Sequence, residues 1–315
     1  METWPKVSIV ILNWNYYEDT IACIYSLRKV DYPNIEIIVV DNGSTNESVE
    51  ILRSTFPRIT LLMSNENVGF AAGSNIGIKY ALDKGTNYVL LLNNDTEVDK
   101  NFLKPLVKVA EKDEDIGIVT GKIYYYDEPK KLYSAATFLN RMRGGFRNIS
   151  AGMIDHGSFD IPCYVSFISG CLMLIKRKVF EKYGLLPEEY FFGGEDLEFS
   201  LRVSKMFKLY YCPDARIWHK VGASHQKFAP KYIYNSYFSK LLFMKRNLIK
   251  PVWLVWYFVF WIYAKTWLKP KLAKMARLHG SNDFDEIRTP LALNAALLDG
   301  WKKDKITRRD LEQWD

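Results

Sequence analysis

The chain has 315 residues, of which 48% are hydrophobic and 25% are charged, and this balance excludes an intrinsically disordered protein. Its four cysteines lack CxxC spacing, which argues against a zinc knuckle or a disulfide framework and suits a reducing compartment. The net charge of +7 is concentrated in residues 231–315, where sixteen Lys and Arg outnumber eight Asp and Glu, so the preceding part is close to neutral.

The N-terminal stretch METWPKVSIVILNWN does not have the form of a signal peptide. It lacks a basic region followed by a long apolar core and a small-residue cleavage site. We therefore expect a cytoplasmic protein.

The first half of the chain alternates short buried strands with helices. Each predicted strand is a β-branched or Leu-rich run without polar alternation, as in strands buried on both faces. The predicted strands are residues 7–14, 35–41, 59–64 and 88–93, and the predicted helices between them are residues 19–28, 48–55 and 71–83. This repetition predicts an α/β fold with a Rossmann-like, mostly parallel sheet that is flanked by helices and joined by right-handed crossovers.

Polar residues follow each of these four strands. In parallel sheets of this kind, ligands bind beyond the carboxyl ends of the strands. The strand ends carry Asn13-Trp14-Asn15, Asp41-Asn42-Gly43-Ser44, Asn65 with Asn67 and Gly69, and Asn93-Asn94-Asp95. The sequence therefore predicts one rim that is lined with amide groups and carboxylate oxygens.

The alternation of strands and helices loosens after about Gly121. KIYYYDEP and CYVSFISGCLMLI are predicted strands, and KRKVFEKYG is a predicted helix. FFGGEDLEFSLRVSKMF predicts a Gly-Gly turn that opens an amphipathic helix at Glu195 or Asp196. KLYYCPDARIWHK is either a final strand pair or a strand and a loop. No low-complexity linker marks a boundary, so we place a first domain at residues 1–226 and a C-terminal helical region at residues 227–315.

Residues 251–264, PVWLVWYFVFWIYA, form a run of fourteen residues without a charge. As a helix this run is ~21 Å long, which is short beside a hydrocarbon core of ~30 Å. An aromatic helix with a cationic border predicts attachment to the surface of an anionic membrane, with a buried helix or a dimer contact as the alternatives. The bordering cations are Lys250, Lys265, Lys269, Lys271 and Lys274.

The strand end Asn93-Asn94-Asp95 has the donor chemistry of a magnesium or manganese site. Asp95 supplies a hard anionic oxygen, and the amides can add neutral ones. The chain has neither a P-loop GxxxxGK[ST] nor a GxGxxG after its first strand, so we expect a metal to hold any phosphate. The alternative is an ordinary turn, because Asn and Asp are common turn formers.

Six segments, in chain order, resemble a family 2 glycosyltransferase with the GT-A fold, and its rhamnosyltransferase-like subgroup in particular. Each segment alone is a weak signal, but six in order at the family's spacing are specific. The resemblance runs from Lys6 to about Ser224 and implies an inverting sugar transfer. The segments are VSIVILNWN, IEIIVVDNGSTNES, NVGFAAGSNIGI, YVLLLNNDTEV, SGCLMLIKRKVFEKYGLLPEEYFFGGEDLEFSLR and IWHKVGAS.

The resemblance implies a binding site for a nucleotide sugar donor at the predicted rim. The family's first strand ends in Thr-Tyr-Asn beside the nucleobase, where this chain has Asn13, Trp14 and Asn15. Asp41 matches an acid that contacts the pyrimidine ring or ribose, although a tight turn with an N-cap is an alternative role. The other donor-binding positions that the resemblance implies are Asn67, Gly69, Gly73, Asn75, Asn94 and Asp95.

The family's metal motif is Asp-x-Asp, and this chain departs from it with Asn93-Asn94-Asp95. The resemblance implies that Asp95 is the main ligand of Mg²⁺ or Mn²⁺, in a weaker or more substrate-dependent site. His219, in the WHK segment, matches a position that supplies a further ligand in some GT-A enzymes. A purely structural histidine is the alternative.

The GGEDLEF segment matches the family's acidic motif on the acceptor side. The resemblance implies that Asp196 is the general base that takes the proton of the attacking hydroxyl, while Glu195 orients or binds the acceptor. Neighbouring helical residues point ~100° apart, so only one of the two can face the reacting carbon. The alternative is an acidic first turn that complements the helix dipole.

The predicted function is metal-assisted, inverting glycosyl transfer from dTDP-rhamnose or a UDP-sugar to a glycan or polyprenyl-linked acceptor. The expected place is the inner face of the cell membrane, in cell-surface polysaccharide biosynthesis. Two other classes of protein stay open. One is a nucleotidyltransferase, which would require a Gly-rich basic loop after the first strand. The other is an inactive membrane-bound scaffold that binds nucleotide. We expect no nucleic-acid partner, because the basic run carries no RNA or DNA motif. The sequence leaves the oligomeric state open.

Overall fold

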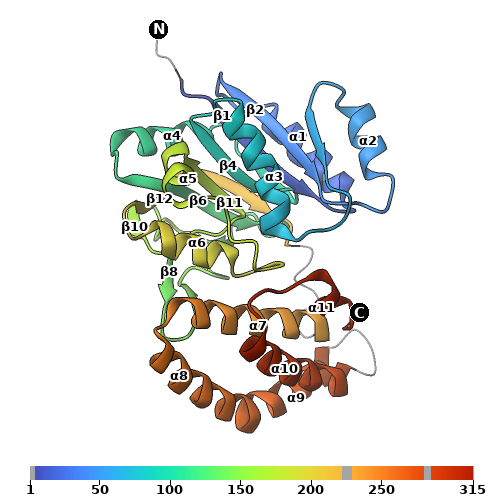
Figure 1. The fold of residues 1–315 in the computed structure, drawn as a ribbon. Coiled ribbons are helices and arrows are strands. Elements are labelled where there is room, and N and C mark those ends of the chain that lie inside the picture. The colour runs from blue at the N-terminus through green and yellow to red at the C-terminus, as the bar shows by residue number, and fades with distance from the viewer. Residues whose placement is uncertain (1–3, 222–228, 280–284, 315) are drawn as a thin grey trace. The chain divides into compact units, whose positions relative to one another are not determined.

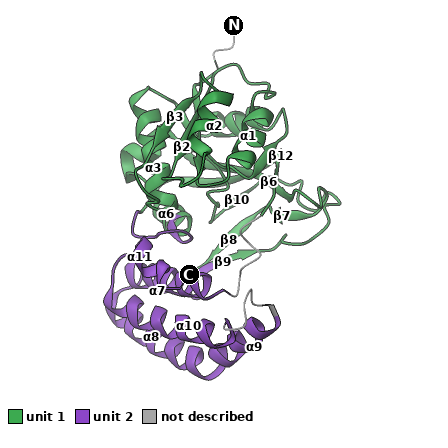
Figure 2. Cartoon of the chain, turned by 90° about the vertical axis from the view of Figure 1, so that its right-hand side faces the viewer, with its two compact units in different colours: residues 1–140, 146–187, 196–221 green, residues 141–145, 188–195, 222–315 purple. Residues whose placement is uncertain are grey.

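The computed structural model describes residues 4–221, 229–279 and 285–314. The chain forms two compact units (Figure 2). Unit 1 comprises residues 1–140, 146–187 and 196–221, and unit 2 comprises residues 141–145, 188–195 and 222–315. The domain boundary predicted at residue 226 lies outside the described residues, so that division into domains stays a prediction.

The N-terminal half of unit 1 is a parallel sheet with helical crossovers (Figure 1). Its β-strands pair in the order β4-β1-β2-β3, and all three pairs are parallel. The elements match the predicted strands and helices to within two residues at each end. They are β1 (Val7–Asn13), α1 (Tyr17–Leu27), β2 (Ile35–Asp41), α2 (Ser48–Thr55), β3 (Thr60–Met63), α3 (Phe70–Asp83) and β4 (Tyr88–Asn93).

The other half of unit 1 contains antiparallel pairs, so the sheet as a whole is mixed. β11 (Leu172–Lys176) runs antiparallel between β4 and β6 (Ile116–Tyr125), whereas β12 (Lys208–His219) runs parallel to β6. The prediction of a mostly parallel sheet is therefore correct for the N-terminal half only. β11 is antiparallel to β6 because the chain between these two strands contains no helix, which a parallel connection usually requires.

Short strands complete this half of unit 1. They are β5 (Thr96–Val98) and β10 (Cys163–Val165), both antiparallel to β12, and β7 (Leu132–Ser134), antiparallel to β6. A separate two-stranded sheet pairs β8 (Thr137–Asn140) with β9 (Gly145–Asn148).

Two predicted segments differ in detail from the structure. CYVSFISGCLMLI is divided into β10 and β11, with residues 166–171 between them. KLYYCPDARIWHK forms the single strand β12, whose pairing with β6 shifts register between Tyr211 and Arg216. Pro213 lies in this interval and has no N–H to donate, which accounts for the irregular ladder. The Gly-Gly turn opens α6 (Glu195–Val203) at Glu195, as predicted.

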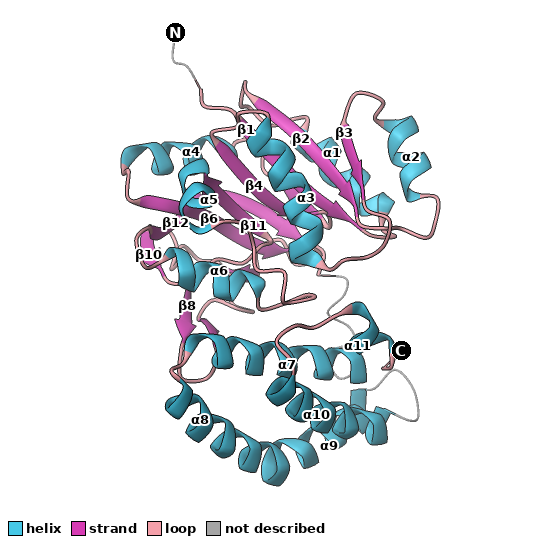
Figure 3. Ribbon diagram, in the orientation of Figure 1, coloured by secondary structure: helices cyan, strands magenta, loops and turns pink. Residues whose placement is uncertain are grey.

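Helices cover both faces of the large sheet (Figure 3). On one face, α1 and α4 (Leu103–Lys112) pack on Ile9, Ile11 and their neighbours. On the other, α3, α5 (Arg177–Tyr183) and α6 pack on alternate side chains that include Val10. A Cβ at Gly77 of α3 would lie 2.5 Å from Val10, so this helix lies very close to the sheet. Burial on both faces explains the uninterrupted apolar runs of the strands.

The C-terminal segment of unit 2 is mainly helical where the structure describes it. It contains α7 (Pro230–Asn247), α8 (Lys250–Tyr263), a π-helical turn (Ala264–Leu268), α9 (Lys269–His279), α10 (Asp285–Lys302) and α11 (Arg308–Glu312). The apolar run at 251–264 is helical, as predicted, and forms most of α8. Among the helices of the described ranges, none has both the length and the apolarity that crossing a membrane requires.

Candidate active site

The carboxyl ends of β1 and β2 meet at one edge of the sheet, where Asn13 and Asp41 are paired in register. Asp41 is 1% exposed, and its carboxylate accepts hydrogen bonds from Asn13 Nδ2 at 2.8 Å, Ser44 N at 2.9 Å and Ser44 Oγ at 2.6 Å. Asn13 Oδ1 in turn accepts the hydroxyl of Thr20 at 2.8 Å. The carboxylate of Asp41 therefore holds the turn after β2, and its predicted contact with the donor stays a prediction.

The loop after β1 is fastened to the loop after β2 through Asn15. This residue has a φ of +60°, a conformation that Asn adopts more readily than most residues. Its side-chain Oδ1 accepts Thr45 N at 2.8 Å, and its backbone carbonyl accepts Asn46 Nδ2 at 3.1 Å. Asn15 N donates to Ser44 Oγ at 2.9 Å. The two loops therefore form one bonded unit.

Asn42 and Asn67 position the start of α3 in the same way. Asn42 Nδ2 donates to Asn67 Oδ1 at 3.0 Å, and Gly69 N donates to the same oxygen at 3.0 Å. Gly69 has a φ of +89°, which favours glycine. A Cβ at Gly73 would lie 2.7 Å from the end of the Leu12 side chain, so a larger residue there would have to displace Leu12. Asn67, Gly69 and Gly73 thus shape the start of α3, and their predicted contact with the donor stays a prediction.

Asn75 has a different set of partners. It is fully buried, and its amide donates to Leu186 O at 3.0 Å while its oxygen accepts Leu186 N at 3.1 Å. Both bonds tie α3 to the segment that follows α5. Asn75 therefore has a structural role, and its predicted role at the donor site stays a prediction.

Asp95 and His219 come together although 124 positions separate them in the chain. Asp95 lies in the turn between β4 and β5, and the antiparallel pairing of β5 with β12 sets Thr96 beside His219. The distance between Asp95 Oδ1 and His219 Nε2 is 3.0 Å. Lys220 N donates to the backbone carbonyl of Asp95 at 2.9 Å. The predicted pair of metal ligands is thus held by backbone pairing.

The His219 ring is buried, with 6% of the residue exposed. Tyr133 packs edge-on against it, with ring centroids 4.9 Å apart. Burial disfavours the charged imidazolium, yet contacts with Cys171 and Asp95 raise the pKa of His219 to about 10. No polar motif in the sequence points to Tyr133 or Cys171 as neighbours of this histidine.

The donor atoms of this pair suit a divalent cation that shares its ligands with a substrate. Asp95 offers a carboxylate oxygen and remains 21% exposed at its side chain. His219 can offer an imidazole nitrogen once the cation displaces the proton that its raised pKa retains. Within the described ranges, no three His, Cys, Asp or Glu side chains are grouped to hold a metal. Mg²⁺ and Mn²⁺ are commonly held by one or two protein ligands together with phosphate and water. The residues present fit such an ion, with Asp95 and His219 as its holders.

The two asparagines before Asp95 have different partners, since Asn94 bonds to α1 and Asn93 lies beside His219. Asn94 Nδ2 donates to Thr20 Oγ1 at 3.1 Å, at the start of α1. Asn93 Nδ2 lies 3.4 Å from His219 Nε2. The structure thus places Asn94 against α1, and its predicted contact with the donor remains to be tested.

Asp196 lies in the first turn of α6. Its Oδ1 accepts Leu197 N at 2.8 Å, and its Oδ2 accepts Gly170 N at 3.3 Å. Burial raises the pKa of Asp196, although these backbone hydrogen bonds act in the opposite direction. Asp196 is partly exposed whereas Glu195 is only 5% exposed. The more accessible of the two acids is therefore Asp196.

Tyr133 is close enough to both Asp196 and Asp95 for their charges to act on its phenol. Burial is the main cause that raises its pKa, and the negative charges of Asp196 and Asp95 both contribute. Both carboxylates therefore lie within electrostatic range of one phenol in unit 1. The Gly-Gly turn before α6 has φ values of +75° at Gly193 and +117° at Gly194, where other residues are strained.

A family comparison identifies the N-terminal part of the chain. Residues 8–184 match the model of a family described as Glycosyl transferase family 2, and the chain belongs to that family. A relative, the dTDP-rhamnosyl transferase RfbF of Shigella flexneri, is 25% identical over 197 residues. These are 62% of this chain and 63% of the relative, so the match spans less than two thirds of that protein. The predicted family and its rhamnosyltransferase-like character are confirmed.

Two solved structures share the fold. One is the mannosyltransferase PcManGT from Pyrobaculum calidifontis in complex with GDP-Man and Mn²⁺, with a TM-score of 0.56 and 16% identity over 95% of this chain and 87% of that one. The other is GalNAc-T7 with UDP, GalNAc and Mn²⁺, with a TM-score of 0.56 and 20% identity over 70% of this chain and 44% of that one. The GT-A fold, with a mixed sheet flanked by helices, is confirmed.

Proposed function

We propose that this protein transfers a hexosyl group from a nucleotide diphosphate sugar to a hydroxyl of a glycan or lipid-linked acceptor, with inversion at the anomeric carbon. The observation that carries the proposal is the pair Asp95–His219, 3.0 Å apart, on the same unit as the partly exposed acid Asp196, in a chain of family 2. The name of the relative RfbF supports dTDP-rhamnose as a donor, with UDP-sugars as the other candidates.

Asp95 and His219 are the residues that would hold Mg²⁺ or Mn²⁺. Such an ion supplies positive charge that offsets the charge growing on the leaving diphosphate. The fixed loops after β1, β2 and β3 orient the donor, because their side chains are already bonded to one another and need no rearrangement. The Mn²⁺ in both structural neighbours supports this use of a divalent cation.

Asp196 acts as the general base. Its carboxylate takes the proton of the acceptor hydroxyl while the acceptor oxygen forms a bond to the anomeric carbon. The bond between that carbon and the diphosphate oxygen breaks at the same time, and the nucleoside diphosphate leaves with the electron pair. The raised pKa of Asp196 makes it a stronger base than an ordinary aspartate. Glu195, its buried neighbour, is assigned to the acceptor side in a supporting role.

A lipid-linked acceptor agrees with the aromatic and cationic helices of unit 2, and we assign the protein to the inner face of the cell membrane in cell-surface polysaccharide assembly. The support is the charge-free run at 251–264 and its lysine border. The reaction itself is independent of this assignment, because every proposed reacting group apart from Glu195 lies in unit 1.

Incubation of the protein with a panel of nucleotide sugars and Mn²⁺ tests the function. Slow release of nucleoside diphosphate, accelerated by an acceptor and abolished by EDTA, is the expected result. Release of pyrophosphate would instead identify a nucleotidyltransferase, and inertness with every donor, together with retained nucleotide binding, would identify a scaffold. Thermal stabilisation by each donor in the presence of Mn²⁺ ranks the candidates for the nucleobase and the sugar.

A further inference from the structure

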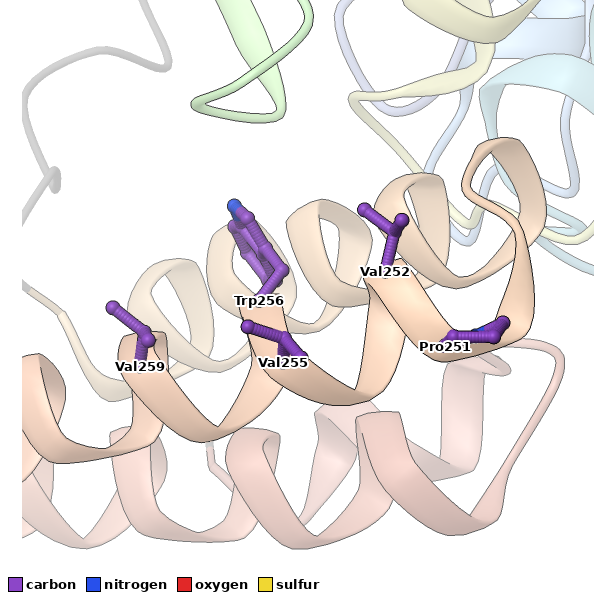
Figure 4. A pocket seen from close by; sticks show the side chains of 5 residues that line it. All are labelled: Pro251, Val252, Val255, Trp256 and Val259. Atoms are coloured by element: carbon purple, nitrogen blue, oxygen red, sulfur yellow. The ribbon is translucent and has the colours of Figure 1, made fainter.

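The outward side of α8 exposes an unusual amount of apolar surface. Val255, Phe258 and Val259 are 66%, 62% and 61% exposed. Val252, Val255, Trp256 and Val259, together with Pro251, line one shallow hollow on this helix (Figure 4). Soluble proteins seldom leave a continuous apolar stripe of this kind uncovered, so the stripe points to a binding surface.

The opposite side of α8 is already in use within unit 2. Trp253 is 5% exposed, and the inward stripe continues through Ala264 and Leu268 into α9. Tyr257 OH donates to Leu297 O of α10 at 2.9 Å, and Trp256 Nε1 donates to Met142 O at 2.8 Å. These contacts fix the rotation of α8 about its axis. The exposed stripe is therefore a defined face and does not result from a loosely attached helix.

α10 adds a second apolar stripe beside the first. Leu298 and Trp301 are 56% and 46% exposed, and they line one hollow with Leu254 and Phe258 of α8. The rings of Tyr257 and Trp301 lie 4.8 Å apart across the two helices. The exposed side chains of α8 and α10 thus form one two-helix surface, which we call the apolar platform.

Cationic side chains follow the apolar ones along α8, the π-helical turn and α9, which are consecutive in the chain. Between residues 240 and 277 the chain has nine Lys and Arg and no Asp or Glu. In α9, Lys271, Lys274 and Arg277 are exposed, and Lys271 lies 4.6 Å from the ring centroid of Trp267. The exposed side chains are therefore mostly apolar in α8 and include three cations in α9.

We propose that the apolar platform and the exposed cations of α9 dock on the surface of an anionic lipid bilayer, with α8 lying in the plane of the interface. The apolar side chains enter the boundary between headgroups and acyl chains, and Lys271, Lys274 and Arg277 bind the lipid phosphates. This surface lies in unit 2 and is independent of the transfer reaction.

Two features favour a bilayer over other occupants. A second copy of the chain, docked face to face, would bring the acid-free segments of both copies together, and like charges would repel. A membrane span does not fit either, because the fourteen residues of α8 reach only ~21 Å, and no described helix meets the length and apolarity for crossing. Exposed Trp side chains beside Lys are typical of the headgroup region.

Flotation of the full chain with vesicles tests the docking surface. We expect the wild type to float with vesicles that contain phosphatidylglycerol, to float much less with pure phosphatidylcholine, and to detach as salt rises. The double variant Val255→Glu/Phe258→Glu should lower the bound fraction by about tenfold or more. The variant Lys271→Glu/Lys274→Glu should lower it by about tenfold at low salt, and the loss should shrink at high salt.

Matched controls come from unit 1. Ile161→Glu and Lys205→Glu alter an exposed apolar residue and an exposed cation there, and both variants should float like the wild type. Quenching of tryptophan fluorescence by brominated lipid should occur in the wild type and disappear in Val255→Glu/Phe258→Glu. Circular dichroism confirms that each variant is folded.

Three outcomes would overturn the docking surface: equal flotation with both vesicle types, unchanged flotation of Val255→Glu/Phe258→Glu, or lipid-free self-association that this variant abolishes. The last would identify a second copy as the occupant. Transfer to a soluble acceptor should be the same in the wild type and in this variant. Loss of transfer in every protein, with vesicle binding intact, would contradict the proposed function and leave the docking surface standing.

Discussion

The loops after β1 and β2 differ from the end of β4 in what their polar side chains bind. Asn13 binds Asp41, and Asn15 binds residues 44–46 of the loop after β2, through short hydrogen bonds. Asp41 is almost wholly buried. Asp95 keeps a fifth of its side chain exposed and binds a single buried imidazole. The polar side chains of the loops after β1 and β2 therefore form a structural frame. The carboxylate of Asp95 is instead partly available to a ligand at the rim.

This difference predicts that substitutions in the two regions fail in different ways. Loss of a frame residue should lower the free energy of unfolding, because a buried partner is left without its hydrogen bond. Loss of the Asp196 carboxylate should lower transfer and leave stability almost unchanged, as is common for residues that act on a substrate. Loss of Asp95 should lower transfer more than stability, because it also removes a hydrogen-bond partner from the buried ring of His219. Substitutions at Asp196, Asp155, Asp95 and Asp41 test this distinction.

Replacement of Asp196 by Asn should have the largest effect. The amide has nearly the shape of the carboxylate but cannot take a proton, so we expect the turnover rate to fall by about 10³ to 10⁴-fold. Donor affinity, measured by isothermal titration calorimetry with Mn²⁺, should change little. Near-normal turnover in Asp196→Asn would show that another group is the base, and Glu195→Gln would then be the next variant to measure.

A buried ion pair on β6 tests whether the loss of a structural polar partner lowers stability. Lys122 is 1% exposed and binds Asp155 at 2.6 Å, and Tyr124 OH donates to the same carboxylate at 2.6 Å. Asp155→Ala leaves the lysine buried with Asp160 as its remaining acid, so unfolding should become easier by about 3 to 5 kcal/mol at neutral pH. Asp160→Ala, at a side chain that is 58% exposed, is the matched control and should cost less.

The pH dependence of this effect follows from the pKa of Asp155. Burial opposes its ionisation, but hydrogen bonds from Lys122 and Tyr124 hold its pKa at about 2, below the ordinary value. A lowered pKa contributes stability that is complete above about pH 4 and is lost as the pH falls toward the folded value. The gap between wild type and Asp155→Ala in urea unfolding should therefore narrow between about pH 4 and pH 2. A gap that stayed constant over this interval would contradict the assignment.

Asp95→Ala should weaken donor binding by about 10²-fold in the presence of Mn²⁺, because one of the two holders of the cation is removed. In the presence of EDTA, wild type and variant should bind the donor with similar affinity. The thermal melting temperature without ligands should fall modestly, because the buried ring of His219 loses its carboxylate partner and keeps Asn93 as a neighbour. The exposed acid Asp127 supplies the control, and Asp127→Ala should behave as the wild type does under all three conditions.

The sequence predicted the strands and helices of the first half closely, because buried parallel strands produce continuous apolar runs. It predicted the order of the second half less well. The antiparallel direction of β11 depends on a long excursion after β6, and no local pattern records direction. The residues of the candidate site were predicted through family segments, but the bonding among them was not. That Asp95 meets His219 follows from the pairing of β5 with β12, which is a long-range contact.

The smallest effect is expected at the frame of the rim. Asp41→Asn replaces a carboxylate oxygen with an NH₂ group that faces the donors of Asn13 and Ser44, so one or more of these hydrogen bonds is lost. Unfolding should become easier by about 1 to 3 kcal/mol, as measured by urea titration. Asp83→Asn, at an exposed carboxylate on α3, should leave stability unchanged.

Donor affinity in Asp41→Asn separates the two roles of this residue. If the carboxylate serves only the frame, affinity for every donor should fall by the same small factor, since all donors depend equally on the shape of the loop. If Asp41 also contacts the ribose or base, affinity should fall unequally between dTDP and UDP donors while the stability loss stays the same. A variant with normal stability but greatly weakened binding would show that the region after β2 belongs with Asp95 among the residues that act on the substrate.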